Sequence, residues 1–146
     1  MNEEEISERP PKSFYWIAGA AFVWDLLGVA AYIGTVTASP EALAELPAAQ
    51  QELIANTPAW STGLFAIAVW GGVIGTLLLL LRRALALPVL IASLAAVVIN
   101  GGYTWFMTNA FEVLGAGQAM FSAVIFVIAA FLVWFANDAK GKGWIN

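Results

Sequence analysis

Asp25 is the residue in this sequence whose type and position point most directly to chemistry, because it lies inside a long apolar segment. It is the only charged residue between positions 13 and 40. If this segment forms an α-helix that enters a membrane at Phe14, the helical rise places Asp25 about 17 Å deep, near the middle of a bilayer. A carboxylate at that depth costs several kcal/mol unless it is paired or protonated, so an acid in this position indicates a functional site.

The partners of Asp25 must be uncharged groups, because no Arg, Lys or His occurs at its depth. We expect the carboxyl group to be protonated or to accept hydrogen bonds from a partner chain or from its own chain. Asn100 is one candidate, since it lies about 20 Å along a helix that starts near Leu87 and runs in the same direction. Deep indole N–H groups also seek partners. The predicted polar cluster therefore comprises Asp25, Asn100, Trp24, Trp70, Tyr32 and Tyr103.

This predicted polar cluster has two interpretations. As a site, it is a cavity in the middle of the membrane, whose aromatic walls stack on a sugar ring or hold another small polar solute. As a structural feature, it is a set of hydrogen bonds between helices, worth about 0.6 kcal/mol each, that fixes the helix register. The residue types are compatible with both.

The helices that position these residues follow from the spacing of the charged residues. Charge-free runs cover residues 53–81, 84–111 and 113–137, and each is longer than the roughly 20 residues that cross a bilayer. With the segment around Asp25, they predict four transmembrane helices, at residues 14–36, 60–81, 85–107 and 118–136. Backbone polar groups in a bilayer must be satisfied internally, so the predicted fold is an all-α bundle of four transmembrane helices.

The basic residues predict the orientation of this bundle. All six lie on one side, at Arg9, Lys12, Arg82, Arg83, Lys140 and Lys142. The opposite loops, residues 37–59 and 108–117, contain none, so the positive-inside rule places both termini in the cytoplasm. We expect a multi-pass protein with a cytoplasmic tail at residues 1–13, a transmembrane domain at 14–136 and a second cytoplasmic tail at 137–146.

The first outer loop is expected to contain a short interfacial helix. Ser39 precedes Pro40 and Glu41, which is the pattern of a capped helix start. Pro47 should end this helix, and residues 48–55 can form another turn or two. The loop is then either a lid or a spacer at the lipid headgroups.

Small residues mark the packing face of the second predicted transmembrane helix. Ala68, Gly71 and Gly75 form a stripe at helical spacing. Such stripes let helix backbones approach closely, either inside one chain or across a dimer.

The composition excludes several classes of function. Of the 146 residues, 61% are hydrophobic and 11% are charged, and both His and Cys are absent. The usual ligands of structural zinc, haem and iron–sulfur clusters are therefore missing, so we expect no metal site, no cofactor and no enzymatic activity. The net charge of −4, without a basic run, excludes nucleic acid as a partner. The expected partner is the lipid bilayer.

Several motifs resemble one protein family. They are Ser-Phe-Tyr-Trp-Ile at 13–17, the stretch 24–32, Pro-Ala-Trp at 58–60, the Arg82-Arg83 turn and Lys-Gly-Trp at 142–144. Together they resemble a functionally uncharacterised family of small four-span proteins of the bacterial inner membrane, whose members often carry the label of sugar transporter. In that family, the positions of Asp25 and Asn100 look like Asn and Gln.

Two functions are expected from these observations. The first is a carrier for a small polar solute such as a sugar, which with four helices would need to form a homo-oligomer to enclose a path. The second is a noncatalytic accessory or structural subunit of a larger membrane complex, which would use Asp25, the glycines and the outer loop as contacts.

Overall fold

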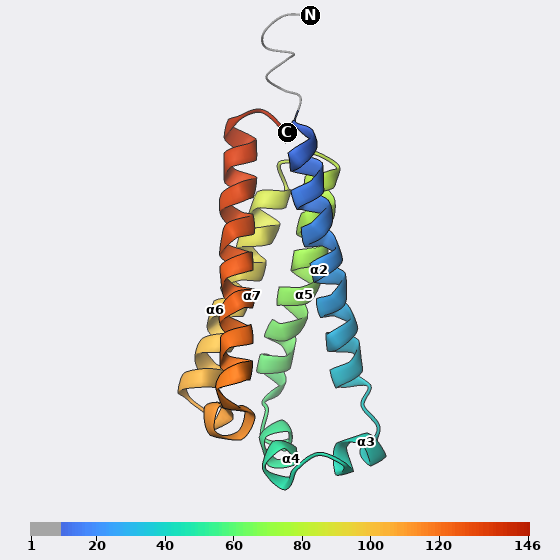
Figure 1. Cartoon of the computed structure of the whole chain (residues 1–146), viewed down its shortest axis with the longest axis vertical. Coiled ribbons are helices and arrows are strands. Elements are labelled where there is room, and N and C mark those ends of the chain that lie inside the picture. Colours follow the sequence, from blue (N-terminus) through green and yellow to red (C-terminus); the bar gives the residue numbers. More distant parts are fainter. Residues whose placement is uncertain (1–9) are drawn as a thin grey trace, which may run out of the picture.

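A computed structural model describes residues 10–146 of the chain, and Arg9 with most of the predicted N-terminal tail lies outside this part. The described residues form helices and no strands (Figure 1). The helices are α2 (Lys12–Val36), α3 (Pro40–Ala44), α4 (Ala48–Ala55), α5 (Ala59–Leu80), α6 (Ala86–Phe106) and α7 (Ala110–Gly141). Helices α2, α5, α6 and α7 are long and apolar enough to cross a membrane. The prediction of an all-helical chain with four candidate spans is confirmed.

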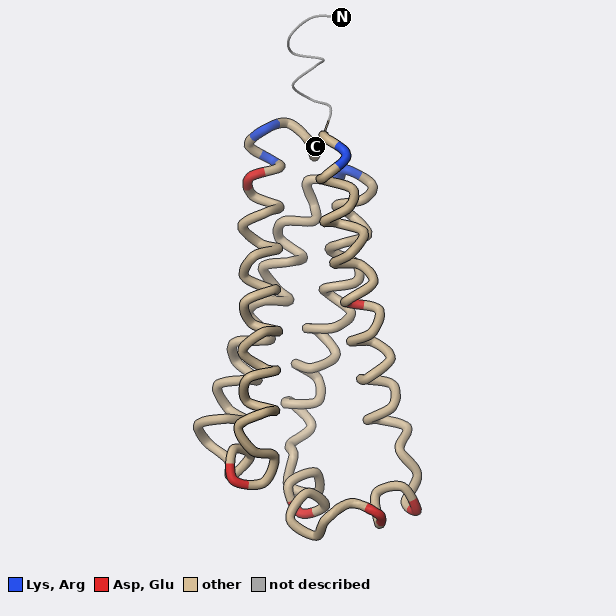
Figure 2. Tube along the Cα trace, in the orientation of Figure 1, with Lys and Arg blue, Asp and Glu red and all other residues tan. Residues whose placement is uncertain are grey.

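The four long helices pack in the order α2, α5, α6, α7, so that each contacts its neighbour in this row. The two outer members of the row, α2 and α7, lie close together where α2 begins and α7 ends, and they separate toward α3 and α4 (Figure 1). We call the first the basic end and the second the acidic end. Lys and Arg gather at the basic end of the described chain, whereas most Asp and Glu lie at the acidic end (Figure 2).

Aromatic side chains close the bundle at the basic end. Phe14 of α2 is fully buried and stacks on Phe135 of α7, with ring centroids 5.6 Å apart. The ring of Trp144 meets Phe14 edge-on at 5.9 Å. Apolar burial of this kind stabilises the contact between α2 and α7 at this end.

The last residues of the chain bind the turn between α5 and α6. The Asn146 N–H donates to the Arg82 carbonyl at 3.0 Å, and the Ala84 N–H donates to the Asn146 carbonyl at 2.7 Å. The Arg82 Nε–H donates to the Trp144 carbonyl at 2.9 Å. The end of the chain is thus part of the closed basic end.

Helix α7 is longer than the predicted helix at residues 118–136. Part of the predicted loop at 108–117 is helical, and Gly115 interrupts it with φ 88° and ψ 174°, a conformation available to glycine. At the other end, α7 continues through Gly141, so the predicted tail at 137–146 begins inside a helix. Asp138 and Lys142 stabilise this last turn with an ion pair at 3.0 Å. The spacing of charged residues predicts where an apolar run ends, but α7 continues beyond the ends of its apolar run.

The short helices between α2 and α5 form where the turn residues predict them. The Ser39 hydroxyl caps α3 by accepting from the Ala42 N–H at 3.1 Å, and Pro47 precedes α4. The Gln51 amide of α4 joins the two helices by donating to the Ala44 carbonyl at the end of α3, at 3.2 Å. Helix α4 also contacts α7, so this segment covers part of the acidic end.

Candidate functional site

A cavity of about 1390 Å³ lies among α2, α5, α6 and α7. All four helices contribute to its lining. Helix α2 contributes Trp24 and Asp25, α5 contributes Gly72, α6 contributes Asn100 and α7 contributes Ser122. The cavity lies where α2 and α7 have separated, beyond the closed contact of Phe14 with Phe135. We call it the central cavity.

The two outer helices meet again at the central cavity through one pair of aromatic rings. Trp24 of α2 and Phe121 of α7 have ring centroids 6.1 Å apart, in a tilted arrangement. Neither α2 nor α7 is otherwise packed extensively against the other, since their main neighbours are α5 and α6 respectively. Beside the central cavity, α2 and α7 are therefore joined by this ring pair and not by close packing of the helices.

Asp25 lies against α5, at Gly72. An added Cβ on Gly72 would be 2.7 Å from Asp25 Oδ1 and 2.8 Å from its Cγ. The carboxyl group therefore occupies the space that any larger residue at position 72 would fill. Asp25 Oδ2 is buried, and no hydrogen-bond partner for it exists among residues 10–146. An unpaired buried oxygen costs about 1–3 kcal/mol, and more if it is charged.

Thr76 is the hydrogen-bonding side chain beside the Asp25 carboxyl group. Its hydroxyl donates to the Gly72 carbonyl of its own helix at 2.8 Å. The Thr76 hydroxyl thus forms a hydrogen bond within α5 as well as lying beside Asp25.

Asn100 does not contact Asp25, contrary to the expectation from residue counting. Its Oδ1 accepts a hydrogen bond from the Ser61 hydroxyl, which joins α6 to α5. Ser61 and Gly72 lie on the same helix and are separated by about 16 Å of helical rise. Counting from helix starts assumes that α2 and α6 begin at one level, whereas Asp25 lies beside Gly72 and Asn100 lies beside Ser61. Asp25 and Asn100 line one cavity at two depths.

The remaining members of the predicted polar cluster are dispersed. Trp70 is 43% exposed and is absent from the lining of the central cavity, because it lies two residues from Gly72 and so on another face of α5. The Tyr32 ring packs on Phe65, 5.3 Å between centroids, and the Tyr103 ring packs on Trp60 at 4.6 Å. Of the predicted aromatic members, Trp24 is the one beside Asp25.

The small-residue stripe of α5 lies against α6. An added Cβ on Gly71 would be 3.2 Å from Ser93 Cβ, and one on Gly75 would be 2.5 Å from Leu90 Cδ2. The Ser93 hydroxyl donates to the Ala68 carbonyl at 2.6 Å. The sequence analysis did not single out Gly72, which follows Gly71 and faces Asp25 of α2. The pair of adjacent glycines could have indicated it, because it lets α6 and α2 approach α5 closely on two neighbouring faces.

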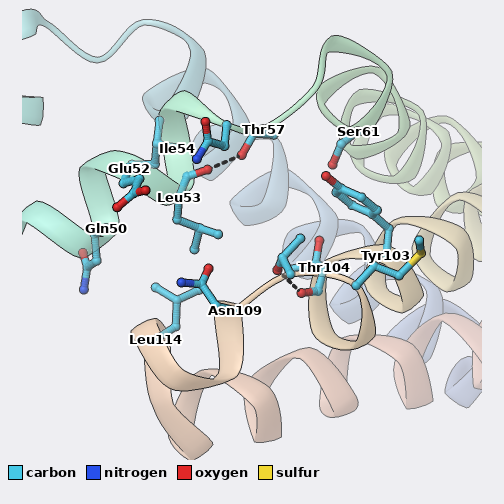
Figure 3. Close-up of a pocket in the computed structure, with 13 residues that line it drawn as sticks. Gln50, Glu52, Leu53, Ile54, Thr57, Ser61, Tyr103, Thr104, Asn109 and Leu114 are labelled. Atoms are coloured by element: carbon cyan, nitrogen blue, oxygen red, sulfur yellow. Dashed lines mark hydrogen bonds between the residues drawn. The ribbon is translucent and has the colours of Figure 1, made fainter.

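A second pocket of about 350 Å³ lies at the acidic end. Leu53 and Thr57 approach it from α4 and the segment after it, Tyr103 from α6, and Leu114 from the start of α7 (Figure 3). We call it the acidic-end pocket. Thr57, Ser61, Thr104 and Leu114 line both this pocket and the central cavity, so the two spaces share a wall of mainly polar residues.

Comparison with protein-family models, with curated proteins and with solved structures gave no match. The resemblance to a family of four-span membrane proteins thus stays a prediction. Within residues 10–146, no group of three or more Asp and Glu side chains gathers where a metal ion could bind.

Proposed function

We propose that this protein is a membrane carrier that binds a small solute in the central cavity beside Asp25. The supporting observation is Asp25 Oδ2, which is buried in the wall of a cavity of about 1390 Å³ without a partner in the described chain. A purely structural acid would be expected to form hydrogen bonds that hold helices together. An unpaired buried acid lowers the stability of the fold, and such a cost is typical of a binding site.

The geometry also suggests a route for the solute. The acidic-end pocket shares four lining residues with the central cavity, whereas Phe14 and Phe135 close the basic end. A solute would enter at the acidic end and reach Asp25. Its release at the basic end would need the rings of Phe14 and Phe135 to separate, which is the alternation of access that a carrier requires.

The distribution of charge supports an orientation for this route. Lys and Arg gather at the basic end (Figure 2), which by the positive-inside rule faces the cytoplasm. We therefore propose a multi-pass protein of the bacterial inner membrane, with both termini in the cytoplasm, that takes up solute from outside.

Single cysteines test whether the central cavity is open to water, because the natural chain contains none. Ser122→Cys lies in the cavity wall, whereas Val124→Cys on the same helix is outside that lining and exposed on the helix surface. In micelles, a charged methanethiosulfonate reagent should modify Cys at 122 rapidly and Cys at 124 slowly. Equal slow modification of both variants would contradict a solute-binding cavity.

The limited contact between α2 and α7 favours a second candidate, in which a partner chain covers this seam. That chain is a second copy in a homo-oligomer, or another subunit of a larger membrane complex. Leu27 lines the cavity and is 63% exposed, so Leu27→Cys should form a disulfide-linked dimer in membranes if two copies meet at the seam. Ile67→Cys, which is exposed on α5 outside the cavity lining, is the matched control.

A further inference from the structure

We infer that the solute of the central cavity is an organic cation with an apolar, ring-containing body, held by Asp25 and by the aromatic rings around it. This inference rests on the proposed function, because it names the ligand class for the same cavity. It replaces the sugar-like solute that the residue types alone suggested.

The charge of the cavity is the first argument. Beyond Lys12, α2 carries only Asp25, and neither α5 nor α6 contains a charged residue. On α7, the charged residues are Glu112 near its start and Asp138 and Lys140 near its end. No basic side chain is thus placed to pair with Asp25 in the described helices. A ligand that brings one positive charge supplies the missing partner.

The walls of the cavity are the second argument. Aromatic side chains come from three helices, with Trp24 on α2, Phe65 on α5, and Phe121 and Phe126 on α7. Aromatic faces attract cations within about 6 Å, most strongly where water is excluded. Trp24 adjoins Asp25 in the chain and contacts Phe121. A cation at Asp25 therefore lies beside aromatic rings as well as a carboxylate.

The polar groups of the cavity argue against a sugar. A sugar ring needs many hydrogen bonds at one place, or its desolvation is uncompensated. The Ser61 hydroxyl is bonded to Asn100, and the Ser93 hydroxyl donates to the Ala68 carbonyl. Asp25 is the charged residue of the lining, and the polar side chains of Gln118 and Ser122 come from α7, on the other side of the cavity. One charge-bearing contact in an apolar space matches a lipophilic cation.

Binding of a permanent cation would require Asp25 to ionise if it is protonated in the empty cavity. The carboxylic O–H bond then breaks, the electron pair stays on the carboxylate that pairs with the cation, and the proton passes to water. The groups of α5 that face Asp25 are Gly72 and Thr76, and neither titrates. The ionisable residue of α6 is Tyr103, and it lines the acidic-end pocket. A cation that binds to the protonated acid should therefore release one proton.

Two ions of the same shape and opposite charge test this inference. Tetraphenylphosphonium and tetraphenylborate are titrated into the purified full-length protein in uncharged detergent, with binding measured by calorimetry. We expect saturable binding of the phosphonium alone. Asp25→Asn should weaken it by roughly 30-fold or more, because a desolvated charge partner is lost. Glu112→Gln removes the same charge from an exposed residue outside the cavity lining and should bind like the natural protein.

Equal binding of the two ions, or unchanged binding by Asp25→Asn, would overturn the inference. If Asp25→Asn does not fold, Trp24→Leu provides a second test, since loss of the aromatic face should weaken phosphonium binding by roughly fivefold or more. Absence of phosphonium binding while Cys at 122 reacts with water-soluble reagents would refute the ligand class and leave the carrier proposal intact. An unreactive Cys at 122 would refute the carrier proposal itself.

Discussion

Substituting Gly72 by Ala tests the contact on which the site depends. The added Cβ would be 2.7 Å from Asp25 Oδ1 and 2.8 Å from Cγ, so the carboxyl group must rotate away or α2 must move. Overpacking of this kind costs about 1–3 kcal/mol. The matched control is Gly101→Ala on α6, whose Cβ would meet no atom within 4 Å.

The expected magnitude follows from the difference between the two variants. Replacing a helical Gly by Ala gains about 0.5–1 kcal/mol at either position through reduced backbone freedom. This gain cancels in the comparison, so Gly72→Ala should be less stable than Gly101→Ala by about 1–3 kcal/mol. Reversible unfolding in mixed micelles, followed by circular dichroism, measures the two free energies of unfolding.

A double-mutant cycle assigns that difference to Asp25. In an Asp25→Ala background the carboxyl group is absent, so the penalty of Gly72→Ala should largely disappear. Equal stability of the two glycine variants, or a penalty that persists without the carboxyl group, would refute the placement of Asp25 against Gly72.

Three other predictions concern protonation, closure and orientation. Infrared spectra of the empty protein at neutral pH should contain a protonated carboxyl band that Asp25→Asn removes, whereas loss of a carboxylate band in that variant would show an ionised acid. Phe14→Ala should lower the free energy of unfolding in micelles by about 3–5 kcal/mol, because the ring is fully buried. Trp16→Ala, at a residue that is 79% exposed, should change this free energy little. Similar losses of stability in the two variants would contradict a closed basic end. Reporter fusions at the C-terminus and near Gln50 should report the cytoplasm and the outside respectively, and the reverse result would overturn the orientation.

The helices themselves could be predicted from the sequence because the bilayer imposes one rule on every span. Apolar runs with at most one charge inside them mark the four long helices, and Ser39, Pro40 and Pro47 mark the short ones. These signals are local, since each depends on the chemistry of a few neighbouring residues. They say little about ends such as that of α7, where an ion pair between Asp138 and Lys142 continues the helix beyond its apolar part.

The candidate site could be predicted only in part, because it depends on how far each helix is shifted and rotated. Asp25 was identified by its cost in lipid, which is a property of one residue. Its distance from Asn100 depends on the relative depths of α2 and α6, and the exclusion of Trp70 depends on the rotation of α5. Both are set by close packing at Gly71, Gly72 and Gly75, which no single residue encodes.

The sidedness of access to the central cavity tests the central claim most directly. In sealed vesicles of known orientation, an impermeant thiol reagent is applied to Ser122→Cys from each side, with Gln50→Cys as the control for the acidic side. We predict modification from the side of α3 and α4 and protection from the side of the termini, where Phe14 and Phe135 close the bundle. Modification from both sides would indicate a pore, and modification from neither would indicate a closed bundle; either result would contradict a carrier that takes solute from the acidic end.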